Sequence, residues 1–230
     1  MRQALIVILM SAPACSSDLV LPETGQTIGS VNKISDEWQT GKVGDILPPL
    51  VVQILSDRQT PLEGVEVSFR LVDPASGVLT PSSSFTNSEG KATATWTLGT
   101  VPGTYTAIAL VGVEESQDSL EFHAAAEAAA PDTLSAESSR NQPGQRREEV
   151  GDPPLVRVLD KYGNPVPNAA VSWEVLSGDG QVTNPVTTTD AEGRTSVAWT
   201  LGNRIGVQKL SAGVDGSDVQ PVIFEARVFF

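Results

Sequence analysis

The chain has 230 residues, of which 40% are hydrophobic, and it carries a formal net charge of −13 at pH 7. This length is sufficient for two domains of ordinary size, and the acidic balance argues against nucleic-acid binding, because neutralising phosphates requires clustered lysine and arginine. The single cysteine, Cys15, excludes an intrachain disulfide. Together with the single histidine, His123, it rules out a His/Cys zinc cluster or Cys–His nucleophile machinery in any simple form.

The amino-terminal residues 1–14 have the layout of a secretory signal. Arg2 supplies the positive charge, residues 4–10 form a short apolar core, and small residues occupy positions 11–14. An apolar run of this length is too short to cross a bilayer as a helix. The sequence therefore predicts an exported protein from which residues 1–14 are removed.

The segment that ends at Cys15 reads Ala12-Pro13-Ala14-Cys15 and resembles a bacterial lipobox, although Ala12 stands where Leu is commonest. The resemblance implies that Cys15 becomes the lipidated first residue of the mature protein. The alternative is an ordinary signal whose cleavage leaves a thiol nearby, but exported chains seldom keep a free cysteine. We therefore expect a lipoprotein of the bacterial cell envelope, surface-exposed or periplasmic, with its membrane contact made through the lipid.

Residues 15–30 are rich in Ser, Gly and Thr and are expected to form a flexible tether. They include the string Leu-Pro-Glu-Thr-Gly at 21–25, which has the letters of a sortase signal. Such a signal lies near the carboxy terminus and is followed by an apolar stretch, whereas here a polar segment follows. We interpret the match as a coincidence.

Two copies of one unit follow the tether. Residues 89–99 and 192–202 are identical at six of eleven positions, and the spacing between the copies is close to 100 residues throughout. That period is too long for a solenoid repeat and matches the size of one β-sandwich. The repeat predicts domains at 31–126 and 131–230, with the Ala-rich stretch 124–130 interpreted as a last strand that runs into a short linker.

Each copy contains short runs rich in Val, Thr and aromatic residues, bounded by Gly, Pro, Asp and Asn, which is the pattern of an all-β fold. Trp96 and Trp199 alternate in step with core positions, so we expect both to be buried; Trp38 lies outside this pattern and is left open. The strands are predicted at residues 50–55, 65–71 and 92–98 in the first copy and at 155–159, 171–176 and 195–201 in the second. Gly90 and Gly193 are expected to take positive φ in hairpin turns.

A turn with the sequence Gly163-Asn-Pro-Val-Pro167, a Val171-Ser-Trp173 strand and the run from Asp190 to Gly202 resemble bacterial Ig-like domains of the invasin and intimin type, group 1. The first copy is looser, with Gln59-Thr-Pro-Leu62 in the turn. The resemblance implies two tandem immunoglobulin-like β-sandwiches without the inter-sheet disulfide. It also implies rigid modules of surface adhesins and lipoproteins, and it says nothing of a ligand.

The sequence offers no catalytic constellation. His123 falls in a predicted strand at the domain boundary, no serine lies in a Gly-x-Ser-x-Gly elbow, and adjacent acids such as Glu148 and Glu149 point apart. We therefore expect a non-catalytic protein with an adhesive or spacer role. The alternatives are an accessory subunit of an envelope or carbohydrate-processing complex and, with less support, a hydrolase.

Mapping the loops of the second copy onto Ig topology places charged residues at both ends of the sandwich, which we call its poles. The pole facing the linker gathers acids suited to calcium, against the alternative of an acidic but empty surface; no other cofactor is expected. The far pole gathers arginines suited to an anionic partner, such as a surface protein or an acidic polysaccharide, unless they pair with Glu148 and Glu149. The acids are Asp160, Asp190, Asp215 and Asp218, and the arginines are Arg140, Arg146, Arg147 and Arg204.

Overall fold

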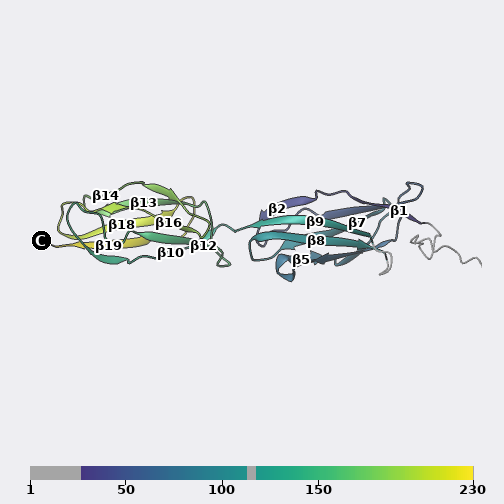
Figure 1. Cartoon of the computed structure of the whole chain (residues 1–230), viewed down its shortest axis with the longest axis horizontal. Helices are drawn as coiled ribbons and strands as arrows, with labels where there is room; N and C mark the ends of the chain where they lie inside the picture. Colours follow the sequence, from purple (N-terminus) through teal and green to yellow (C-terminus); the bar gives the residue numbers. More distant parts are fainter. Residues whose placement is uncertain (1–26, 113–117, 230) are drawn as a thin grey trace, which may run out of the picture.

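The computed structural model describes residues 27–112 and 118–229, which form two elongated β-sandwiches lying end to end (Figure 1). The predicted signal 1–14, Cys15 and most of the predicted tether lie outside the described residues. In the part of the chain that is described, no helix is both long and apolar enough to cross a membrane.

The first sandwich consists of two sheets, with strand orders β1-β3-β7-β5 and β2-β9-β8-β4-β6. All neighbouring strands in them are antiparallel except β2 and β9, which are parallel. Its elements are β1 Ile28–Lys33, β2 Trp38–Lys42, β3 Leu50–Ser56, β4 Glu66–Leu71, the 3-10 helix η1 Pro74–Ser76, β5 Gly77–Thr80, β6 Ser83–Phe85, β7 Lys91–Leu98, β8 Gly103–Val111 and β9 Asp118–Glu127. Residues along β3 alternate between buried and half-buried, as the period of two predicts for a strand with one face on a core.

The second sandwich repeats this plan, with sheets β10-β12-β16 and β11-β19-β18-β13-β15 and a short β14-β17 pair. Its strands are β10 Pro131–Ala136, β11 Asn141–Gly144, β12 Leu155–Asp160, β13 Ala170–Ser177, β14 Gln181–Val182, β15 Val186–Thr188, β16 Arg194–Ser196, β17 Trp199–Thr200, β18 Gly206–Val214 and β19 Val222–Val228. The continuous strand predicted at 195–201 is split into β16 and β17, which pair with different partners. The predicted tandem immunoglobulin-like architecture is confirmed.

Each sandwich has its own core, and a tryptophan occupies the middle of each. Trp96 and Trp199 are fully buried, as the repeat predicts, and so are the phenylalanines of the last strands, Phe122 and Phe224. The two sets of buried residues form separate clusters. Because each core is complete within its own repeat, each sandwich is expected to fold as a unit.

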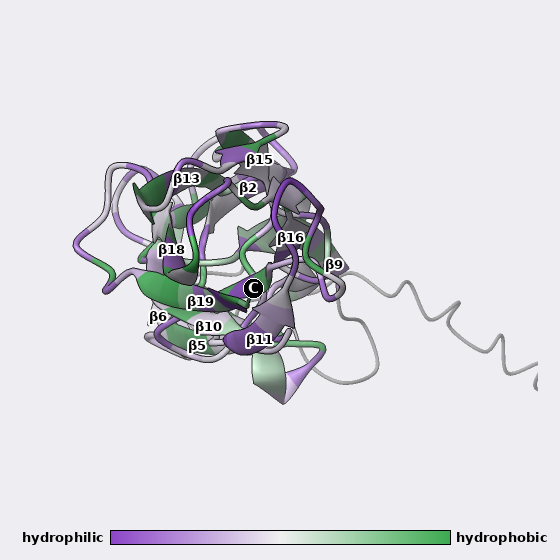
Figure 2. Ribbon diagram, turned by 90° about the vertical axis from the view of Figure 1, so that its left-hand side faces the viewer, coloured by the Kyte–Doolittle hydropathy of each residue, from purple (hydrophilic) through white to green (hydrophobic). Residues whose placement is uncertain are grey.

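The outer strand β11 shows how one edge of the second sandwich is protected. Figure 2 shows β11 as a hydrophilic strand beside the hydrophobic β19, with which it pairs in parallel. Pro143 lies within β11 and has no amide hydrogen to offer a further strand. A proline and polar side chains on an edge discourage pairing with another chain.

The domain boundaries differ slightly from those predicted. β1 begins at Ile28, so the first sandwich starts three residues before position 31 and the predicted tether of 15–30 is correspondingly shorter. β9 continues through the Ala-rich stretch to Glu127 because Ala124 and Ala126 point into the core. Residues 128–130 then connect it to β10, which begins at Pro131.

Candidate functional site

A polar site built from several hydrogen bonds lies at the junction of the two sandwiches. The end of β12 leads into a turn at residues 160–165, which we call the junction turn, and this turn faces the linker and the adjacent loops of the first sandwich. Asp160, the last residue of β12, is only 2% exposed. A carboxylate with so little solvent contact must find its hydrogen-bond donors within the protein.

Asp160 binds the linker and the junction turn at once. Its Oδ2 accepts a hydrogen bond from the Ala129 amide (3.0 Å), and its Oδ1 accepts from the amides of Tyr162 and Asn164 (both 2.9 Å). The Asn164 side-chain amide also donates to Oδ2 (2.9 Å). Burial alone would raise the pKa of Asp160, but the donors from Asn164, Ala129 and Tyr162 stabilise the charged form, and the net result is a pKa below the ordinary value.

Two further contacts of the junction turn reach the first sandwich directly. The Asn164 side chain donates to the carbonyl of Thr100 (2.8 Å), in the connection between β7 and β8. Tyr162 packs against Gly44, where an added Cβ would lie 2.5 Å from the Tyr162 hydroxyl oxygen, and Gly44 has a φ of +82°. A side chain at position 44 is therefore disfavoured both by the backbone and by the neighbouring tyrosine.

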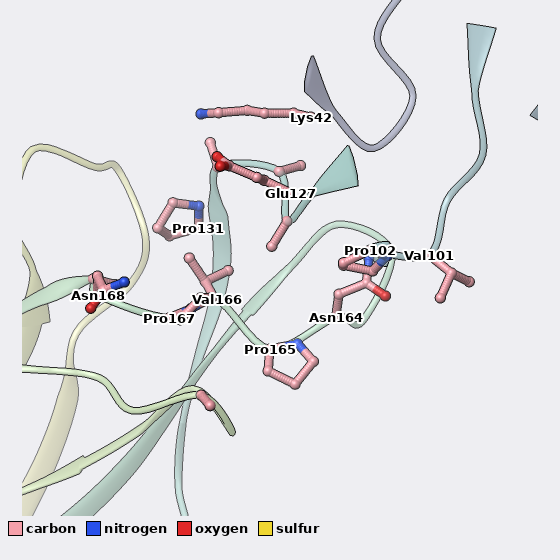
Figure 3. A pocket seen from close by; sticks show the side chains of 15 residues that line it. Lys42, Val101, Pro102, Glu127, Pro131, Asn164, Pro165, Val166, Pro167 and Asn168 are labelled. Atoms are coloured by element: carbon pink, nitrogen blue, oxygen red, sulfur yellow. The ribbon is translucent and has the colours of Figure 1, made fainter. Parts of the chain in front are cut away.

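A cleft of about 870 Å³ opens beside these contacts (Figure 3). Lys42 and Glu127, at the ends of β2 and β9, lie on one side of it, and prolines and alanines of the linker and junction turn form much of the rest. In Figure 3 Asn164 lies close to Val101 and Pro102 of the first sandwich. The cleft is thus shaped by both sandwiches and by the linker.

The first copy shows which of these groups the sandwich itself needs. Its residues at the positions of Asp160 and Asn164 are Ser56 and Thr60, whose hydroxyls lie 2.7 Å apart. The Ser56 hydroxyl accepts from the Thr60 amide (3.2 Å), so a hydroxyl is sufficient to hold this turn. The second copy has a carboxylate and an amide instead, and their additional atoms contact the linker and the first sandwich. Comparing the copies in this way would have found the site from the sequence.

Three of the four aspartates suggested for calcium have separate hydrogen-bond partners in the structure, and the fourth, Asp218, lies in the connection between β18 and β19. Asp160 is occupied as described, Asp190 Oδ1 accepts from the amides of Glu192 (3.0 Å) and Arg194 (2.8 Å) in its own turn, and Asp215 accepts a hydrogen bond from Ser172. Among residues 27–112 and 118–229, no three or more acidic, histidine or cysteine side chains are grouped so that they could hold a metal ion. The geometry therefore gives the calcium hypothesis no support.

The arginines suggested for the far pole are only partly brought together. The Arg147 amide donates to Leu201 O (3.1 Å) and the Arg204 amide to Asp179 Oδ1 (3.2 Å), so both lie at the pole opposite the linker, and Arg146 lies there beside Phe229. No ion pair found in the described part of the chain joins these three arginines to Glu148 or Glu149.

Arg140 does not belong to this pole, contrary to the prediction. Its Nε donates to the carbonyl of Ile223 (3.1 Å), and its own carbonyl accepts from the Glu225 amide (2.7 Å), near the middle of β19. The segment after β10 is not a plain loop, because it adds the edge strand β11 to the second sheet. Arg140 precedes that strand and is therefore held on the side of the sandwich.

Comparison with known proteins identifies other proteins with immunoglobulin-like domains. Residues 154–224 match the model of the bacterial Ig-like domain, group 1. The Escherichia coli adhesin FdeC is 20% identical with a TM-score of 0.53, over 87% of this chain and 64% of that structure, and InvD of Yersinia pseudotuberculosis is 15% identical with a TM-score of 0.52, over 86% and 58%. The D0-D1 domain of intimin is 20% identical over 88% of this chain and 99% of that one, with a TM-score of 0.35. A search of curated proteins gives no match.

The two sandwiches, their internal repeat and their junction define a protein built from tandem immunoglobulin-like modules. The second sandwich is a bacterial Ig-like domain of group 1, which confirms the resemblance carried by the residues between Gly163 and Gly202. This chain spans about three fifths of the FdeC and InvD structures, and at these identities the similarity establishes the fold alone.

Proposed function

We propose that this protein is an exported, non-catalytic arm of the bacterial cell envelope, attached to a membrane by lipid on Cys15 and holding its distal sandwich away from the surface. The observation that carries the proposal is the junction turn, which binds both the linker and the first sandwich through Asp160 and Asn164. Such an arm suits an adhesive or structural role, because it holds the distal sandwich at a fixed distance from the membrane. FdeC, whose fold is similar to that of this chain, is an adhesin, which supports the proposal.

Tandem domains are usually expected to move relative to each other on a flexible linker. A stiff junction distinguishes the proposed arm from that arrangement. The linker amide of Ala129 and the Thr100 carbonyl belong to different parts of the junction, and both are bound by one turn. Spin labels at Ser83→Cys and Ser196→Cys, in a Cys15→Ser background, should give a single narrow distance distribution. A broad distribution would show independent sandwiches and contradict the proposed arm.

Lipid attachment predicts where the protein is found. Wild-type chain expressed in a bacterial host should partition with membranes, whereas Cys15→Ser should be released or remain unprocessed. Several acyl chains make membrane attachment effectively permanent, while a single chain is readily reversible. Fractionation and mass spectrometry of the amino terminus test this. A mature soluble chain with a free thiol at Cys15 would show that the lipoprotein assignment is wrong.

The pole opposite the linker is the proposed contact with an anionic partner, for which the probe is oligogalacturonate, an acidic polysaccharide fragment. Replacing Arg146, Arg147 and Arg204 together by serine should abolish binding at low salt without changing the melting temperature. Arg147 has a φ of +63°, but serine experiences the same backbone strain. Binding by wild type should weaken as salt rises, because exposed charges are screened over about 10 Å at 0.1 M.

Arg140→Ser is the matched control, because the structure places this arginine on the side of the sandwich. It should retain oligogalacturonate as well as wild type does. Equal retention by wild type and the triple variant would contradict a role for the far pole in anion binding, while leaving the junction and its stiffness untouched.

A further inference from the structure

Trp38 is a large aromatic side chain exposed on the surface of the first sandwich. It begins β2, and because Gln39 is buried in the next position, Trp38 points outward and is 60% exposed. One side of its ring is covered by His123, with the ring centroids 4.6 Å apart and an interplanar angle of 31°. His123 is held in turn by the Thr106 hydroxyl, 3.1 Å from Nδ1. An exposed large aromatic fixed on a rigid sheet is an informative surface feature.

The second sandwich shows that the fold does not need this aromatic pair. Trp38, His123 and Thr106 are neighbours on β2, β9 and β8, and the corresponding neighbours on β11, β19 and β18 are Asn141, Glu225 and Lys209. There Lys209 and Glu225 form an ion pair of 2.7 Å at the sheet surface. The same position in the same architecture is therefore filled by charged and polar groups, so the fold itself does not require an aromatic pair here.

The surface beside Trp38 is formed by small side chains, most of which carry a hydroxyl group. The next outward row on the same strands consists of Thr40, Ala125 and Thr104, and the row after it begins with Lys42 and Glu127 at the mouth of the junction cleft. Alternate residues on a strand lie about 7 Å apart, so the strip from the first row to the third is about 13 Å long. Threonine hydroxyls both donate and accept hydrogen bonds.

We propose that this strip is a carbohydrate-binding site for a neutral glycan chain, with one sugar ring stacked on Trp38 and the chain extending along β2 and β9 toward the junction cleft. The apolar C–H face of a pyranose matches the open face of the indole, while its hydroxyls match those of Thr40 and Thr104. The acids Glu121 and Glu127 on β9 outnumber Lys42 along this strip, and the chain carries a net charge of −13, so an anionic sugar is disfavoured here.

Other occupants fit this surface less well. Protein interfaces bury roughly 800 Å² on each partner around an apolar centre, whereas here the row beside a single tryptophan consists of two threonines and Ala125. Proline-rich peptides bind grooves lined by several aromatic side chains. The other exposed aromatic described on this sheet, Phe85, lies on β6 at the opposite edge. One platform flanked by hydroxyls favours a sugar chain.

The test uses the intrinsic fluorescence of the full chain. Trp96, Trp173 and Trp199 are buried, so a ligand that stacks on Trp38 should shift the emission of the one exposed tryptophan. The probes are chitotetraose, cellotetraose, maltotetraose and xylotetraose at millimolar concentration. At least one should give a saturable shift, and calorimetric titration should show binding that is weakened at least about tenfold by Trp38→Ala and less by Trp38→Tyr.

Phe85→Ala is the control for loss of an exposed aromatic elsewhere on the sheet and should bind like wild type. Trp38→Ala should melt at the wild-type temperature because the ring is largely exposed, so that lost binding is not lost folding. Failure of all four probes to bind, equal binding by wild type and Trp38→Ala, or binding of octaproline in place of the sugars would each overturn the proposal. None of these results bears on the stiffness of the junction or on lipid attachment.

Discussion

Replacing Trp199 by alanine should destabilise the second sandwich by about 3–5 kcal/mol, the usual cost of removing a large aromatic from a core. Trp199 is fully buried in the cluster of the second sandwich, which shares no residue with the cluster of the first. Scanning calorimetry of the full chain should therefore show one transition moving to much lower temperature while the other stays close to its original position. Trp96→Ala should produce the converse.

The two tryptophans also allow a finer comparison. Trp96 Nε1 donates to the carbonyl of Ser76 (3.0 Å) in η1, whereas Trp199 Nε1 has no acceptor in the described structure. Phenylalanine removes the indole donor and keeps much of the apolar volume, so Trp96→Phe should cost more than Trp199→Phe, by about 1 kcal/mol for one buried hydrogen bond. Unchanged melting of Trp199→Ala would mean that the ring is not part of the core, which would contradict the fold described above.

The features that the sequence predicts well are those set by neighbouring residues. Alternation places Trp96 in β7, and the glycines expected to take positive φ do so, with values of +70° at Gly90 and +75° at Gly193. The repeat supplies the rest, because two copies of one pattern with a period near 100 residues specify the same sandwich twice. Strand position and core membership follow from such local and periodic signals.

The features that escaped prediction depend on contacts between distant segments. The Asp160 carboxylate is satisfied by Ala129, 31 residues away, and Asn164 by Thr100 in the other sandwich. The position of Arg140 cannot be predicted because the edge strand β11 is too short and too polar to be recognised from its sequence. The orientation of Trp38 escapes prediction for a similar reason, since only the parallel pairing of β2 with β9 establishes which way it faces.

Replacing Asp160 by alanine should have two effects: it should loosen the junction, and it should destabilise the second sandwich. The amides of Ala129, Tyr162 and Asn164 would lose their acceptor, and a polar group left unsatisfied in a buried setting costs about 1–3 kcal/mol. Some of this cost would be recovered where water can reach the turn, so we expect a net loss of about 2–4 kcal/mol. The spin-label distance distribution between the sandwiches should broaden in the same variant.

Asp160→Ser is the matched control, because it installs the residue that the first copy uses at Ser56. It should preserve the turn and most of the stability of the second sandwich, yet still broaden the distance distribution, since a hydroxyl cannot bind the junction turn and Ala129 together. A narrow distribution in both variants would show that apolar packing alone holds the junction, and Asp160 would then be a residue of the turn only.

Acid should reproduce the effect of the substitution in the wild-type chain. The pKa of Asp160 in the folded protein lies below its ordinary value of 3.8, so the stabilisation it provides is fully present at pH values above that ordinary value. It is lost as the pH falls through the lower pKa of the folded state, because the carboxyl must then be protonated among groups that donate to its charged form. Between about pH 5 and pH 2, the melting temperature of the second sandwich should fall more steeply in wild type than in Asp160→Ser. Parallel slopes for the two proteins would mean that other carboxylates govern the acid sensitivity of this domain and that the charge on Asp160 contributes nothing to the junction.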